Sequence, residues 1–77
     1  MPRNLDLSAL RSFVTVADVG GVTRAAGYLN LTQSAVSMQI KKLEDILGRA
    51  VFARDARSVT LTTDGEMLLG YARRLLA

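Results

Sequence analysis

The chain has 77 residues, of which 49% are apolar, and a formal net charge of +3 at pH 7. This length predicts one small domain, and the apolar fraction is too high for a disordered segment. Cysteine and histidine are both absent, which excludes disulfides, thiolate metal sites and zinc fingers. No apolar run is long enough to cross a membrane, and the first residues do not form a secretory signal. We therefore expect a cytoplasmic protein with no membrane partner.

The positive charge is concentrated in the middle of the chain. Between Arg24 and Arg57 there are six cations and three anions, whereas the remainder has four of each. The whole net charge thus falls in this window. Such a basic region is suited to nucleic-acid phosphates, although the same bias also serves solubility.

The N-terminal segment is predicted to be a supporting helix. Apolar residues recur every three or four positions from Leu7 to Ala17. Asp6 is suited to cap its start, and Gly20 and Gly21 are suited to end it.

Residues 22–41 are predicted to form a helix-turn-helix. Ala25, Ala26 and Leu29 have helical spacing, and the two alanines permit another helix to cross closely. Asn30 tolerates the left-handed backbone that a turn needs. Thr32 can then cap a second helix, which runs from Gln33 to about Leu47.

This second helix is predicted to have a buried face and a DNA-reading face. At about 100° per residue, one stripe contains Val36, Ile40, Leu43 and Leu47. The opposite side contains Ser34, Ser37, Met38, Lys41 and Asp45, with Gln33 at the helix start. Hydroxyl and amide groups near a helix N-terminus can read base edges, and a cation further along can bind phosphate. The alternative is a merely solvated polar face, which the tandem helices and the capping threonine make less favourable.

Two short β-prone runs, 50–53 and 58–61, predict a small hairpin or wing after Gly48. Between them lie Arg54 and Arg57. We expect these arginines to contact phosphates or a narrow minor groove, the alternative being solvated charge.

The last helix is predicted to begin at Thr62 or Thr63, where Thr63 with Glu66 fits a capping box. The chain stops at Ala77 without a helix-ending signal, which suggests a piece of a longer protein.

The apolar surface of this last helix is wider than one contact stripe. We expect Leu68, Ala72 and Leu75 to face the core. Leu69 and Leu76, seven residues apart, are expected to form the seam of a homodimer. The alternative leaves the surplus leucines exposed, as is common on surfaces.

The whole chain from Leu7 to about Leu76 resembles the N-terminal DNA-binding domain of the bacterial LysR-type transcriptional regulators. The resemblance rests on motifs in the same order and spacing: Leu10-Arg11-Ser12-Phe13, Thr23-Arg24-Ala25-Ala26, Gln33-Ser34-Ala35-Val36-Ser37, Gln39-Ile40, Leu43-Glu44, Leu47-Gly48, Phe52-Ala53-Arg54, and Leu61-Thr62 with Gly65. It implies a mostly α winged helix-turn-helix of three helices and a two-stranded wing over residues 1–62. The start of a linker and dimerisation helix would follow over residues 63–77.

The resemblance also implies a function for the chain. It implies a regulator that binds an interrupted inverted repeat in double-stranded promoter DNA as a homodimer, with higher oligomers in the full-length protein. A small-molecule effector would bind only in a separate C-terminal domain absent from these residues, and no cofactor is expected here. The residues expected to contact DNA are Thr23, Thr32, Gln33, Ser34, Ser37, Met38, Lys41, Arg54 and Arg57.

Two positions depart from the family's pattern. Gly21 stands where the family commonly has serine, so the start of the following helix is expected to be capped less well. Met38 stands where many members have arginine, and it offers apolar contact, for example to a thymine methyl group.

Two other classes of function are weaker readings. A winged helix that binds protein would present apolar or acidic residues along the outer face of 33–47, and the serines, glutamine and lysine there argue against it. An enzyme is not expected, because the adjacent Glu44 and Asp45 point about 100° apart on a helix and no glycine-rich phosphate loop is present.

Overall fold

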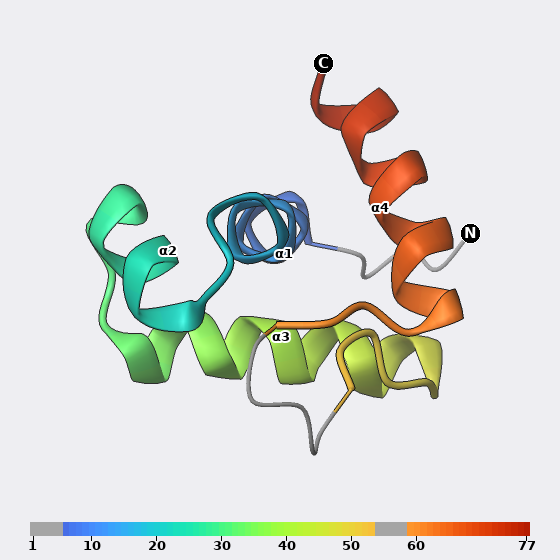
Figure 1. Cartoon of the computed structure of the whole chain (residues 1–77), viewed down its shortest axis with the longest axis horizontal. Helices are drawn as coiled ribbons and strands as arrows, with labels where there is room; N and C mark the ends of the chain where they lie inside the picture. Colours follow the sequence, from blue (N-terminus) through green and yellow to red (C-terminus); the bar gives the residue numbers. More distant parts are fainter. Residues whose placement is uncertain (1–5, 54–58) are drawn as a thin grey trace.

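The computed structural model describes residues 6–53 and 59–77, and these ranges contain four helices (Figure 1). They are α1 (Leu7–Val19), α2 (Val22–Leu29), α3 (Gln33–Leu47) and α4 (Thr63–Leu76). Helix α1 lies in the middle and packs against the other three, and α2 also packs against α3. The predicted mostly α class is confirmed. In the described part of the chain, no helix combines the length and apolar character that a membrane crossing needs.

The predicted ends of α1, α2 and α3 are confirmed. The Asp6 carboxylate accepts a 2.9 Å hydrogen bond from the backbone N–H of Ser8 at the start of α1. Gly20, Asn30 and Gly48 end α1, α2 and α3 with φ angles of 82°, 57° and 69°. Each adopts the left-handed conformation for which its residue type is suited.

The core is built around α1 and the inner side of α3. Its largest fully buried side chains are Phe13, Leu10, Leu43, Val16, Val36 and Val51. The ring of Phe13 lies 5.4 Å from that of Phe52, at 52° between planes. The predicted inner stripe of α3 is buried, except that Leu47 at its end is partly exposed.

Within the described residues, the two β-prone runs pair at one antiparallel bridge, Phe52 with Leu61. The N–H of Ala53 donates to the carbonyl of Thr60 at 2.8 Å. Before the bridge, the N–H of Val51 donates to a Glu44 carboxylate oxygen at 2.9 Å. This bond ties the incoming run to α3.

The N-cap of α4 is Thr62, and the capping box predicted for Thr63 with Glu66 is wrong. The Thr62 hydroxyl accepts from the N–H of Gly65 at 3.0 Å and donates to the carbonyl of Ala50 at 2.7 Å. One side chain therefore caps the helix and also fastens it to the segment after α3. Thr63 is the first helical residue and cannot fill that role.

The core side of α4 differs at one position from the prediction. Leu68 and Ala72 are buried as expected, but Leu75 is 42% exposed, so its inward placement was wrong. The last turn of α4 rises above the level of α1 in Figure 1. Leu69 and Leu76 are partly buried and pack against the core.

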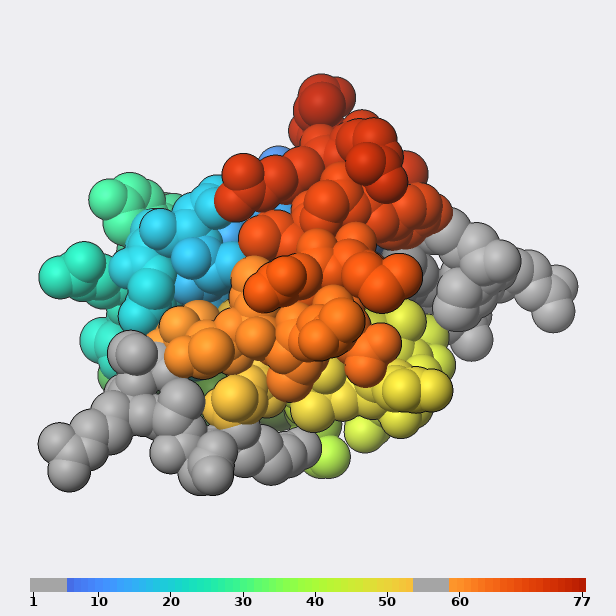
Figure 2. Space-filling model, turned by 45° about the vertical axis from the view of Figure 1, so that its right-hand side comes forward, coloured from blue at the N-terminus to red at the C-terminus, as the bar shows by residue number. Residues whose placement is uncertain are grey.

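Helix α4 meets the segment before it very closely at Gly65. Figure 2 shows α4 directly above residues 59–62 and the end of the first described range. A Cβ atom on Gly65 would lie 2.0 Å from the carbonyl oxygen of Val51 and 3.0 Å from a methyl of Leu61. Because the nearer atom belongs to the backbone, it cannot move aside by a rotamer change.

We therefore expect Gly65→Ala to destabilise the domain by about 1–3 kcal/mol or more, as overpacking does. The matched control is Gly70→Ala on the same helix, where an added Cβ meets nothing within 4 Å. That change should stabilise by roughly 1 kcal/mol through helix propensity. Thermal unfolding of both variants checks this. Equal effects of the two substitutions would contradict the close approach at Gly65.

Candidate nucleic-acid interface

The outer face of α3 is an exposed, mostly polar surface. The side chains of Gln33, Ser34, Ser37, Met38 and Lys41 are all exposed, and Met38 is 71% exposed. Helix α3 itself runs along the lower side of the helical bundle in Figure 1, with α1 above it. The structure thus brings these five predicted residues onto one accessible surface.

Thr32 holds the N-terminus of α3 in shape. Its hydroxyl oxygen accepts a 3.0 Å hydrogen bond from the backbone N–H of Ala35, as the sequence predicted for the cap. A threonine hydroxyl that accepts one bond still has its own proton to donate. Thr32 can therefore cap the helix and donate to a phosphate oxygen at once.

Helix α2 adds two exposed polar side chains. Thr23 in its first turn is exposed, and so is Arg24 beside it. Among the described residues, no carboxylate forms an ion pair with Arg24, which leaves its charge available. From the sequence, Arg24 was predicted only as part of the basic region and not as a DNA contact. At the start of the helix Gly21 provides no side-chain cap, as expected from its departure from the family's pattern.

Two part-buried polar contacts, neither of them predicted from the sequence, fix how α3 sits. The hydroxyl of Ser12, which is 1% exposed in α1, donates to the side-chain carbonyl of Gln39 in α3. Glu44 in α3 accepts from Val51, as described above. The detectable signal for the first was a serine set between Leu10 and Phe13 in an apolar stripe.

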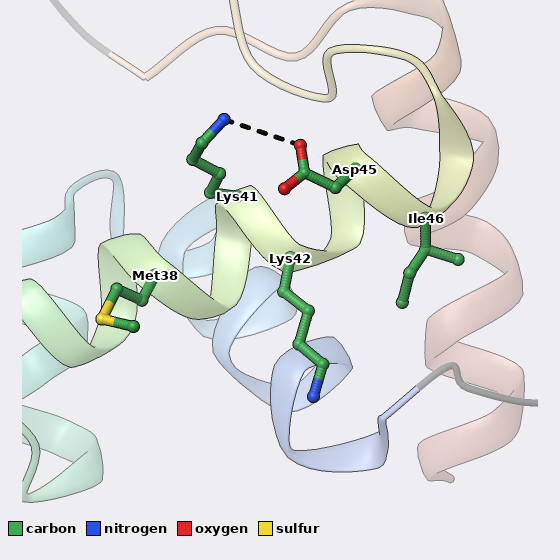
Figure 3. A pocket seen from close by; sticks show the side chains of 5 residues that line it. All are labelled: Met38, Lys41, Lys42, Asp45 and Ile46. Atoms are coloured by element: carbon green, nitrogen blue, oxygen red, sulfur yellow. Dashed lines mark ion pairs between the residues drawn. The ribbon is translucent and has the colours of Figure 1, made fainter.

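Carboxylates hold three of the cations in and near the interface. Lys41 lies 3.5 Å from Asp45, Lys42 lies 3.5 Å from Asp6, and Arg49 lies 3.7 Å from Asp64. Figure 3 shows Lys41 turned towards Asp45, whereas Lys42 turns to the other side of α3, towards α1. The N–H of Ser8 and, secondarily, the Lys42 ammonium hold the pKa of Asp6 below its ordinary value.

Arg54 and Arg57, the predicted wing contacts, lie outside the described residues. Their role stays a prediction. Within 6–53 and 59–77, no cluster of three or more carboxylates forms that would hold a metal ion.

The sequence matches one protein family over most of its length. Residues 7–66 match the family described as "Bacterial regulatory helix-turn-helix protein, lysR family". The fold and the exposed second helix of the motif define a winged helix-turn-helix protein. The chain belongs to the LysR family of bacterial regulatory proteins.

Curated relatives agree with this assignment. The chain is 49% identical over 74 residues to the HTH-type transcriptional regulator DgdR of Burkholderia cepacia, covering 96% of this chain and 25% of that protein. It is 49% identical over 73 residues to PecT of Dickeya dadantii, covering 95% of this chain and 23% of that regulator. The chain thus spans about a quarter of the length of the relatives it matches.

Solved structures show the same fold. The BenM DNA-binding domain in complex with catB site 1 DNA superposes with a TM-score of 0.88 at 38% identity, covering 92% of this chain and 79% of that one. The CbnR DNA-binding domain in its DNA complex superposes with a TM-score of 0.86 at 34% identity, covering 92% of this chain and 82% of that one.

The cap at Thr32 predicts a separable structural effect. We expect Thr32→Ala to destabilise the domain by about 1 kcal/mol, because the Ala35 N–H loses its acceptor. Thr32→Ser keeps the hydroxyl and should lose little. Urea unfolding of the two variants measures the difference. Similar losses in both would show that the hydroxyl does not stabilise α3.

Proposed function

We propose that this chain is the DNA-binding region of a transcriptional regulator that inserts α3 into the major groove of promoter DNA. The observation that carries the proposal is the outer face of α3, an exposed and mostly polar surface opposite a buried apolar stripe. The names of the relatives and the DNA complexes of the BenM and CbnR domains support it. A protein-binding winged helix is not favoured.

Each exposed residue has a role suited to its chemistry. Gln33, Ser34 and Ser37, in the first turns of α3, are placed to read base edges, and Met38 to contact a thymine methyl. Donors to phosphate are provided by Thr23, Thr32, Arg24 and Lys41. Arg54 and Arg57 would add wing contacts to phosphates or a minor groove.

The whole protein is proposed to work as a homodimer on an interrupted inverted repeat. Two copies on a two-fold axis would place one α3 in each half-site, so that the spacing of the half-sites follows the dimer geometry. The small-molecule effector is proposed to bind in a separate domain. The protein is proposed to act in the cytoplasm, with no cofactor in this region and without catalysis.

Base reading by α3 predicts a selective loss of operator binding. Gln33→Ala and Ser37→Ala should each weaken binding to the operator by roughly 1–3 kcal/mol and hardly change binding to unrelated DNA. Ser8→Ala is the matched control, since Ser8 is an exposed serine on α1. Gel shifts with the DNA upstream of the protein's own gene and with an unrelated duplex measure both affinities.

Equal weakening on both DNAs would mean that these residues contact only the backbone. A wild-type chain that binds neither DNA in a salt-dependent way would overturn the proposed function.

The dimer contact is proposed to lie on α4. Its most exposed apolar side chain is Met67 at 71%, and Leu75, the residue before the last of the helix, is exposed as well. Leu69 and Leu76, the seam expected from the sequence, are partly exposed but also pack against the core. Charged substitutions at these two leucines would therefore disturb folding together with pairing.

Met67→Glu combined with Leu75→Glu should convert the dimer to a monomer with little change in melting temperature, because neither side chain is buried. Sedimentation of the chain, free and on operator DNA, measures the state. If the dimer survives this change but dissociates in a folded Leu69→Glu, Leu76→Glu variant, the dimer contact lies at those two leucines instead. A wild-type chain that is monomeric under both conditions would contradict pairing through α4.

A further inference from the structure

The outer face of α3 carries a carboxylate where a DNA-binding surface is expected to be neutral or basic. Asp45 comes out roughly 180° from the buried Val36, and so points straight away from the core. Its carboxylate lies 3.5 Å from the Lys41 ammonium, one turn earlier (Figure 3). The two side chains are 67% and 70% exposed.

This ion pair does little for the stability of α3. Exposed pairs one turn apart contribute little because both groups are well solvated. The order is also the weaker one, with the cation before the anion, and the carboxylate lies towards the negative end of the helix dipole. The main effect of Asp45 is therefore on the charge that α3 presents outward.

We propose that Asp45 is a built-in competitor for the DNA phosphate at Lys41 and limits sequence-independent binding. The inference rests on the proposed function, since it concerns how the same face of α3 meets DNA. In the free protein, Asp45 pairs with the Lys41 ammonium, to which a DNA phosphate would otherwise bind. On binding, Lys41 exchanges one anion for another, and Asp45 is left beside the polyanion.

The exchange has a measurable consequence for the salt dependence of binding. A lysine that neutralises a phosphate normally releases counterions and steepens the slope of log affinity against log salt by about 0.9. When the lysine leaves a carboxylate to do so, that carboxylate takes up a cation, which offsets much of the release. Lys41 should therefore add its full slope only when residue 45 is neutral.

Two other described cations near this surface, Lys42 and Arg49, do not share the arrangement. Lys42 is paired with Asp6 on a different helix and turns away from Lys41. Arg49 pairs with Asp64 at the start of α4. Within the described residues of α3, Asp45 is the carboxylate that lies on the outward stripe with Met38 and Lys41.

The test uses a short, labelled duplex of mixed sequence and fluorescence anisotropy between about 50 and 200 mM salt. Asp45→Asn should raise affinity roughly three- to tenfold at about 0.1 M salt and steepen the slope by about 0.9. Lys41→Ala should change the wild-type slope only slightly, yet flatten it by about 0.9 in the Asp45→Asn background. The slope of the double variant should then equal that of Lys41→Ala.

Asp18→Asn is the matched control, because it makes the same charge change beside Arg73, at 2.6 Å, away from α3. Its slope should equal that of the wild type. Melting curves confirm that all variants are folded.

Equal slopes for Asp45→Asn and wild type, or weaker binding by Asp45→Asn, would overturn the inference while leaving DNA binding intact. An equal rise of affinity in Asp18→Asn would also overturn it, because the effect would then come from the overall charge. Absence of salt-dependent binding in every variant would instead overturn the proposed function, and the inference with it.

Discussion

The rotation of α3 about its own axis is the constraint on which the rest of the molecule depends. Burial of Val36, Ile40 and Leu43 against α1 turns one side of the helix inward. The bond from Ser12 to Gln39 adds a polar contact of defined direction, which a purely apolar interface lacks. Since the residues of a helix are about 100° apart, fixing this inner side also fixes which side chains point outward.

The segment after α3 uses the same helix as its anchor. The carboxylate of Glu44 accepts the N–H of Val51, and the side chain of Val51 fills the core. The carbonyl of Val51 then accepts from Thr62 at 3.0 Å and lies where only a glycine at position 65 fits. The base of the wing and the start of α4 are thereby placed relative to the outer face of α3 by a few short contacts.

The surface is less basic than the count of cations suggests. Lys41, Lys42 and Arg49 each have a carboxylate nearby, whereas Arg24 in α2 has no ion-pair partner among the described residues. An exposed pair is weak and exchanges readily with other ions. The electrostatic contribution to DNA binding thus depends on the arrangement of charges as well as on their total of +3.

The sequence by itself determined the four helices and most of their ends. Capping by Asp6 and Thr32 and the left-handed turns at Gly20 and Asn30 involve residues within a few positions, so the signal is local. The two faces of α3 also followed from its apolar spacing, and the family resemblance followed from motif order.

The features that the sequence did not predict depend on distant parts of the chain. The hydroxyl of Thr62 reaches Ala50, and Leu75 is exposed although its helix packs against α1. The Ser12 and Gln39 side chains meet across 27 residues, and Gly65 is required by a carbonyl that packing brings against it. Periodicity shows which side of a helix is apolar, but only tertiary packing decides how far a neighbouring element extends over that side and which polar groups it brings within reach.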